Sequence, residues 1–209
     1  MARENVGISR AVAQNLLNVR PGIVGTIAVP GGGGSEPVIQ EGRDFVSEFM
    51  DTQTGVFHEE AFRHLLTREA GRATRYQDFF SVCLLRPDIS DDRRQMEEIE
   101  RAISEKIPEF VRATDFVGQM SSAIAVILLH TAGPDALRVA ERIRASLEQV
   151  AFREGPEGRP QRLTVSVGNV SFPNDGHTDS ILLSQALAYL EQAVQRGGNQ
   201  VSHGSGSPD

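Results

Sequence analysis

Arg112 and Asp115, three residues apart, form the pair in this 209-residue chain with the clearest capacity for molecular recognition. A guanidinium group donates two parallel hydrogen bonds to guanine or to a phosphate, and a carboxylate accepts hydrogen bonds from N–H groups. The pair alone carries little weight, because a chain this rich in arginine is expected to contain one such spacing by chance. Its weight comes from the segment that follows it.

That segment, residues 116–131, predicts a strand, a tight turn and a second strand. Together with Arg112 and Asp115 it resembles the signature hairpin of GGDEF domains, the diguanylate cyclases, in which R-x-x-D lies five residues before G-G-D/E-E-F. The signature positions hold Ser121, Ser122, Ala123, Ile124 and Ala125. The resemblance therefore implies a degenerate GGDEF domain that has lost the chemistry of its turn.

Three further motifs extend the resemblance over about residues 45–203. Residues 51–56 are similar to the D-x-L-T-G-L turn that opens these domains, and residues 166–168 are similar to their S-x-G strand. Residues 197–201 match the closing G-R-N-x-V motif apart from its arginine. Each motif is unspecific alone, but their order and spacing are specific together.

The alternation of apolar patterns predicts a mixed α/β (α+β) domain, and the resemblance implies a central mixed sheet flanked by helices. We expect a helix over residues 59–73, followed by elements in the order β-α-α-β-β-α-β-α-β. They are a strand at 79–85, a helical stretch at 91–111 interrupted near Pro108, a hairpin of 116–118 with 124–130, a helix at 134–150, a strand at 163–172, a helix at 178–196 and a strand at the closing motif.

Cyclase chemistry would need carboxylates that hold a divalent metal against GTP, and glycine where the backbone approaches phosphate. Where the family places its first metal-binding aspartate, this chain has Arg86, and only Asp88 survives nearby. The family's triphosphate-binding lysine falls at Val194, and the arginine of its closing motif falls at Gly198. The guanine-reading segment has no counterpart between residues 89 and 109. We therefore expect no catalytic residues, no metal, no cofactor and no cyclase activity.

The retained pair lies where GGDEF domains carry their product-binding inhibitory site, so the resemblance implies that Arg112 and Asp115 bind cyclic di-GMP. The family's additional arginine of this site lies in an A-E-R-I-R-like stretch, which is residues 140–144 here. Arg142 lies in this stretch, and Arg138 precedes it by one helical turn, so both should project away from the core. The alternative is a solvated charged face, with Arg112 and Asp115 closing a helix-to-strand turn.

Composition excludes some classes of function. The formal net charge of -7 argues against binding to nucleic-acid polymers, which relies on basic surfaces. No apolar run approaches the roughly 20 residues that a membrane span needs, and the N-terminus lacks a signal-peptide core. Cys83 lies in an apolar run and is expected to be buried and reduced. We expect a cytoplasmic protein that does not insert into membranes.

The chain divides into an N-terminal peptide at 1–30, a Gly-rich linker at 31–37, the degenerate domain at 38–203 and a disordered tail at 204–209. The linker contains Gly-Gly-Gly-Gly-Ser, which indicates either an engineered fusion or a natural spacer.

Within the N-terminal peptide, the apolar residues Ile8, Val12, Leu16 and Val19 fall near one helical face, and residues 23–29 are extended in character. About 30 residues cannot bury a core of their own. We therefore expect this peptide to dock, either as the binding segment of a partner protein or as an arm of this chain.

The leading hypothesis is a catalytically dead GGDEF domain that acts as a cyclic di-GMP receptor in bacterial signalling. The resemblance implies that binding could link two copies of the chain or reshape a surface that holds a protein partner. The alternative is a ligand-independent interaction module with the same fold. A GTP-binding regulatory domain is a third reading, disfavoured by Arg86, Val194 and Gly198.

Overall fold

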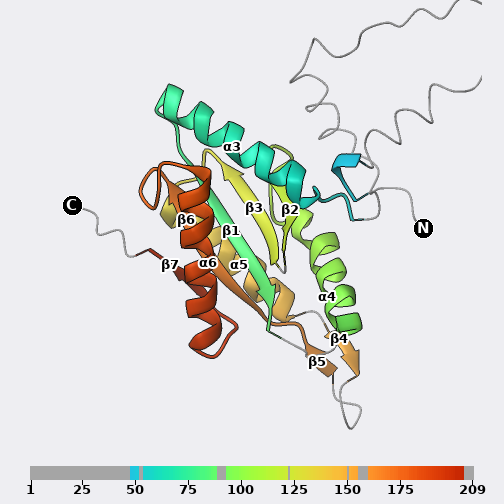
Figure 1. Cartoon of the computed structure of the whole chain (residues 1–209). Helices are drawn as coiled ribbons and strands as arrows, with labels where there is room; N and C mark the ends of the chain where they lie inside the picture. Colours follow the sequence, from blue (N-terminus) through green and yellow to red (C-terminus); the bar gives the residue numbers. More distant parts are fainter. Residues whose placement is uncertain are drawn as a thin grey trace, which may run out of the picture.

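The computed structural model describes residues 48–51, 54–88, 93–121, 123–149, 151–154 and 160–204 (Figure 1). The predicted N-terminal peptide, the linker and all of the tail except Gly204 lie outside these residues, as do residues 38–47 and 89–92. The described part confirms a mixed α+β fold in which helices flank a central sheet.

The sheet has five strands in the order β2-β3-β1-β6-β7. The strands are β1 (Phe80–Pro87), β2 (Phe116–Met120), β3 (Ala123–Leu129), β6 (Val165–Phe172) and β7 (Val201–His203). β1 pairs antiparallel with β3 on one side and with β6 on the other, and β7 runs parallel to β6. The central strand β1 is therefore hydrogen-bonded along both of its edges.

Helices cover both faces of the sheet (Figure 1). They are α3 (Glu59–Tyr76) and α6 (Asp179–Gln195) on one face, and α4 (Arg93–Lys106), the 3-10 helix η1 (Ile107–Glu109) and α5 (Gly133–Glu148) on the other. Val82 and Leu84 of β1 join the core beneath α3 and α6, whereas Cys83 and Leu85 join the core beneath α4 and α5. Alternate residues of one strand thus supply two separate cores.

The elements agree with the predicted order, with one exception. A two-stranded hairpin, β4 (Ala151–Glu154) with β5 (Pro160–Arg162), lies between α5 and β6 and was not predicted. After Ala151 and Phe152, residues 153–162 are charged, polar, glycine or proline, so the stretch lacks the apolar alternation that signals a strand. The predicted break near Pro108 is confirmed, because η1 replaces the α-helix there.

Cys83 is fully buried, as predicted, and its thiol donates a hydrogen bond to Asn169 Oδ1 over 3.2 Å. Burial, with a smaller effect from the charge of Asp115, raises the pKa of Cys83 to about 12. In the part of the chain that the structure describes, no helix is long and apolar enough to span a bilayer.

Gly168 of β6 lets α6 pack directly on the sheet. A Cβ atom at this position would lie 2.1 Å from the carbonyl oxygen of Ala186 and 2.5 Å from the backbone nitrogen of Leu190. Both atoms belong to the helix backbone, so no side-chain rotation relieves the clash. The S-x-G motif therefore has a packing role.

We predict that Gly168→Ala lowers the free energy of unfolding by about 1–3 kcal/mol or more, because α6 must move away from the sheet. Gly71→Ala is the matched control, since no heavy atom lies within 4 Å of a Cβ atom there and the residue is exposed within α3. The control should raise stability by roughly 0.5–1 kcal/mol. Chemical denaturation of both variants measures the difference, and equal midpoints would contradict the packing role.

Candidate functional site

The Arg112–Asp115 turn is closed by the Asp115 carboxylate. Asp115 Oδ2 accepts the backbone N–H of Arg112 over 2.8 Å, and Oδ1 accepts the backbone N–H of Leu129 over 3.1 Å. The backbone N–H of Asp115 donates to the Arg112 carbonyl over 3.0 Å. The carboxylate thereby fastens the turn to the end of β3.

Asp115 is only 7% exposed. This burial raises the pKa of Asp115, although the N–H donors of Arg112 and Leu129 oppose the shift. Because both oxygens already accept backbone hydrogen bonds, the carboxylate holds the turn in shape and presents little surface to solvent. For Asp115, this geometry agrees with the structural alternative, in which the residue closes a helix-to-strand turn.

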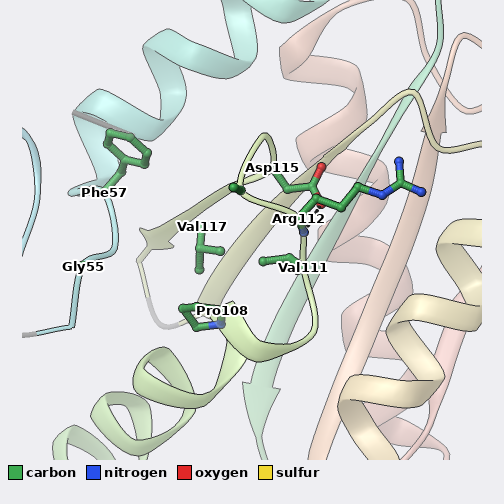
Figure 2. A pocket seen from close by; sticks show the side chains of 8 residues that line it. Gly55, Phe57, Pro108, Val111, Arg112, Asp115 and Val117 are labelled. Atoms are coloured by element: carbon green, nitrogen blue, oxygen red, sulfur yellow. Dashed lines mark hydrogen bonds between the residues drawn. The ribbon is translucent and has the colours of Figure 1, made fainter. Parts of the chain in front are cut away.

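Arg112 has the opposite character. Its side chain is exposed, and Figure 2 shows the guanidinium extending outward from the turn. Among the residues that the structure describes, we find no hydrogen bond or ion pair to this guanidinium. Its five N–H donors are therefore available to a ligand without the loss of an internal bond.

The two predicted arginines of α5 are both exposed, as expected. Arg142 Nη2 donates to the carbonyl of Phe110 over 2.7 Å, which brings this side chain against the segment that leads into Arg112. Arg138 instead forms an ion pair with Asp135, one turn earlier on its own helix, over 2.8 Å. The structure thus places Arg142 next to the turn, whereas the described ion pair of Arg138 stays within α5.

A small hollow lies beside the turn (Figure 2). Its volume is about 80 Å³, and its lining is mostly apolar. The lining residues are Gly55, Phe57, Pro108, Val111, Arg112, Ala113, Asp115 and Val117. Figure 2 shows the guanidinium of Arg112 pointing away from this hollow.

At the other end of β1, Arg86 is engaged by α6. Its guanidinium donates to both carboxylate oxygens of Glu191, over 2.7 and 3.2 Å. These hydrogen bonds hold the pKa of Glu191 below its usual value. A cation with its own carboxylate partner therefore occupies the place where the resemblance puts a metal-binding aspartate.

Asp88 is engaged as well. Its carboxylate accepts hydrogen bonds from the Ser166 hydroxyl and, over 2.8 Å, from the backbone N–H of Asn199. Gly198 has a φ of +74°, and a Cβ atom there would lie 2.9 Å from the Asp88 carboxylate. A side chain at position 198 would displace Asp88. Position 194 is a half-buried valine on α6.

The residues at this end of β1 do not fit a divalent cation. Arg86 brings positive charge, and both oxygens of the surviving carboxylate at Asp88 already accept hydrogen bonds. Within the described ranges, no three histidine, cysteine, aspartate or glutamate side chains are grouped to hold a metal ion.

The turn between β2 and β3 keeps the shape of a tight hairpin. Met120 pairs with Ala123, which leaves two residues in the turn, and Ser121 has a φ of 54°. The Ser121 N–H donates to Glu59 Oε2 over 2.8 Å, and this bond holds the pKa of Glu59 below its usual value. A carboxylate of α3 thus accepts the backbone N–H at the turn where the resemblance places a phosphate.

The last three signature positions belong to the protein core. Ala123, Ile124 and Ala125 are 8%, 2% and 0% exposed. Sequence reasoning missed the partners Glu59 and Glu191. Only the place of Glu59 in the first turn of a helix could have suggested a contact with backbone N–H groups.

In the comparison with protein families, the family model described as "Diguanylate cyclase, GGDEF domain" matches residues 48–200. Comparison with curated proteins gives no significant relative.

Solved GGDEF structures are similar in fold. The coiled coil and GGDEF domain of DgcB from Caulobacter crescentus, in complex with c-di-GMP, has a TM-score of 0.69 and 18% identity, covering 79% of this chain and 92% of that chain. The GGDEF domain of PA1120 (TpbB or YfiN) from Pseudomonas aeruginosa has a TM-score of 0.62 and 21% identity, covering 74% and 93%.

Diguanylate cyclase SiaD from Pseudomonas aeruginosa, solved with its activator SiaC, has a TM-score of 0.63 and 22% identity, covering 79% of this chain and 67% of that chain. At these identities the similarity concerns the fold.

We predict that Ser121→Gly raises the free energy of unfolding by about 0.5–1 kcal/mol, because glycine adopts a positive φ without the steric cost that serine bears. Ser184→Gly, at an exposed position inside α6, is the control and should lower it by a similar amount. Urea denaturation tests the pair. A loss of stability in both variants would contradict the left-handed turn.

Proposed function

The chain belongs to the GGDEF family of diguanylate cyclases, and on that premise we propose that it is a catalytically inactive member that serves as a cyclic di-GMP receptor. One observation carries the proposal. Arg112 is an exposed guanidinium that makes no hydrogen bond or ion pair among the described residues, although its charge opposes the rise that burial causes in the pKa of the nearby Asp115 carboxyl, and the turn that carries it is fixed by that buried carboxylate. The related DgcB structure contains c-di-GMP, which supports this ligand.

In the proposed site, Arg112 donates two hydrogen bonds to guanine O6 and N7 or to a phosphate. Arg142 adds positive charge beside Arg112 and can exchange its bond to the Phe110 carbonyl for one to the ligand. Arg138 adds a further positive charge on α5, one turn before Arg142. Asp115 acts by holding the turn. Accepting guanine N–H groups would require Asp115 to share or release a backbone bond.

The negative charge of the ligand determines which groups of the protein must attract it. Cyclic di-GMP carries two phosphodiester groups, and the protein has a net charge of -7, so long-range electrostatics oppose the approach of the ligand. Local cations must supply the attraction. Arg112 supplies it at the lowest cost, since its side chain gives up no internal ion pair on binding.

The proposed catalytic inactivity rests on the groups at the Arg86 end of β1, away from the Arg112 turn. Metal-assisted phosphoryl transfer needs carboxylates free to bind a cation and backbone donors free to bind phosphate. Arg86 is paired with Glu191, Asp88 is bonded to Ser166 and Asn199, and the Ser121 N–H is bonded to Glu59. Each group would have to break an internal bond before it could serve catalysis.

The second candidate is a protein-interaction module that binds no nucleotide. The burial of Asp115 favours it, because the fold alone explains why this carboxylate is present. Under either proposal the chain acts on a protein partner or a second copy, and only the first makes that action depend on the ligand. SiaD, of similar fold, was solved with a protein activator.

Calorimetric titration with cyclic di-GMP separates the two. We expect binding by the parent protein, and Arg112→Ala should weaken it by roughly tenfold to a hundredfold, since losing one bidentate contact costs about 1–3 kcal/mol. Arg196→Ala is the matched control, because Arg196 is also exposed and follows α6. The control should bind as the parent does.

Two outcomes of the titration would count against the receptor. A parent protein that gives no heat at tens of micromolar ligand binds too weakly for the role. If Arg112→Ala and Arg196→Ala both retain the affinity of the parent, the ligand binds elsewhere.

We further predict that incubation with GTP and Mg²⁺ or Mn²⁺ yields no cyclic di-GMP. Restoring Gly-Gly-Asp-Glu-Phe at residues 121–125 should not produce activity, because Arg86 and Asp88 keep their internal partners. Circular dichroism must show that the repaired variant folds, since positions 124 and 125 lie in the core. Chromatographic detection of product from either protein would refute the proposed inactivity.

A further inference from the structure

We propose that the apolar hollow beside the Arg112–Asp115 turn is the docking site for an aliphatic side chain from residues 23–29 of the same chain. This proposal is independent of cyclic di-GMP binding. It assigns a surface to the N-terminal peptide, for which the sequence alone predicts docking without a location.

The volume and the apolar lining of the hollow indicate which kind of group it can hold. Its volume of about 80 Å³ is well below the roughly 300–1,000 Å³ of typical small-molecule sites. It is several times the space that one water molecule needs. Residues Phe57, Pro108, Val111 and Val117 line it, and Figure 2 shows the side chains of the last three gathered on one side of the turn. A branched aliphatic side chain matches both the volume and the lining.

The point at which the described chain begins favours an occupant from the same molecule. Met50 pairs with Phe57, and the His58 N–H donates to the Phe49 carbonyl over 2.9 Å. Phe57 itself lines the hollow. The chain that leads back to residue 29 therefore starts beside the site.

The length of the intervening chain is sufficient. Residues 30–47, 18 in all, separate the proposed segment from the first described residue. A chain of 18 residues spans roughly 23 Å as a random coil, and such a tether raises the effective concentration to about the millimolar range. A weak apolar contact becomes populated at that concentration.

The composition of the segment also fits. Residues 23–29 carry no charge, and Ile23, Val24, Ile27 and Val29 are branched aliphatic residues. Residues 1–30 contain three arginines and one glutamate, a net charge of +2, so the total of -7 leaves -9 on residues 31–209. Opposite net charges attract the peptide to the domain, and the apolar hollow then fixes the contact.

Hydrogen exchange of the full chain, measured by mass spectrometry, tests the proposal. In the parent protein, amides of residues 23–29 should exchange at least tenfold more slowly than in Ile27→Asp. Val111→Asp and Ala113→Glu, which place charge in the lining, should abolish the same protection. Ala113 is exposed, so its variant keeps the test valid if Val111→Asp fails to fold. Ile181→Asp, at a 47% exposed position on α6, is the matched control and should leave the protection intact.

Three results would overturn the proposal. Residues 23–29 could exchange equally fast in the parent and in Ile27→Asp. Their protection could survive both Val111→Asp and Ala113→Glu. Their protection could also vanish on dilution, which would identify a second copy as the source of the segment. None of these results depends on cyclic di-GMP, so the receptor proposal is judged separately by its own titration.

Discussion

The burial of β1 on both edges and both faces decides where chemistry can lie in this molecule. β1 is hydrogen-bonded to β3 and β6, and residues 80–85 are at most 3% exposed. An unpaired charge in such surroundings costs several kcal/mol. Charged groups are therefore confined to the ends of the sheet, where each one either finds a partner inside the protein or reaches solvent.

Charged groups at the two ends of the sheet are stabilised in different ways. Where β1 ends, Arg86 and Asp88 are satisfied by partners from α6, β6 and the loop after α6, so a ligand would have to compete with bonds that are already made. At the Arg112 turn, the backbone is held by Asp115, while the guanidinium makes no hydrogen bond or ion pair to any residue that the structure describes. Recruiting Arg112 there costs the ordering of its side chain, about 2 kcal/mol or less, and breaks no hydrogen bond of its guanidinium. A ligand would therefore compete with fewer internal hydrogen bonds at the Arg112 turn than at the Arg86 end of β1.

Local patterns in the sequence predicted most of the fold. An apolar run marked β1, the similarity to the S-x-G strand marked β6, Pro108 marked the end of α4, and the short gap between two apolar runs marked the hairpin of β2 and β3. The pairing of charges could not be predicted in this way. Arg86 and Glu191 are 105 residues apart, and Glu59 and Ser121 are 62 apart, so only the folded backbone brings each pair together. The hairpin of β4 and β5 was missed because backbone pairing, without an apolar pattern, defines it.

The burial of Asp115 changes what the Arg-x-x-Asp spacing means. Its carboxylate closes the turn and bonds to the end of β3, so the fold has a reason to keep an aspartate there whether or not a ligand binds. No hydrogen bond or ion pair of the described chain gives a comparable reason for Arg112, whose guanidinium acts on Asp115 through its charge alone. Any residue that tolerates the same backbone conformation would satisfy the fold at position 112. The identity of the arginine, rather than the spacing of the pair, is therefore the feature that separates a ligand-binding domain from an inherited scaffold.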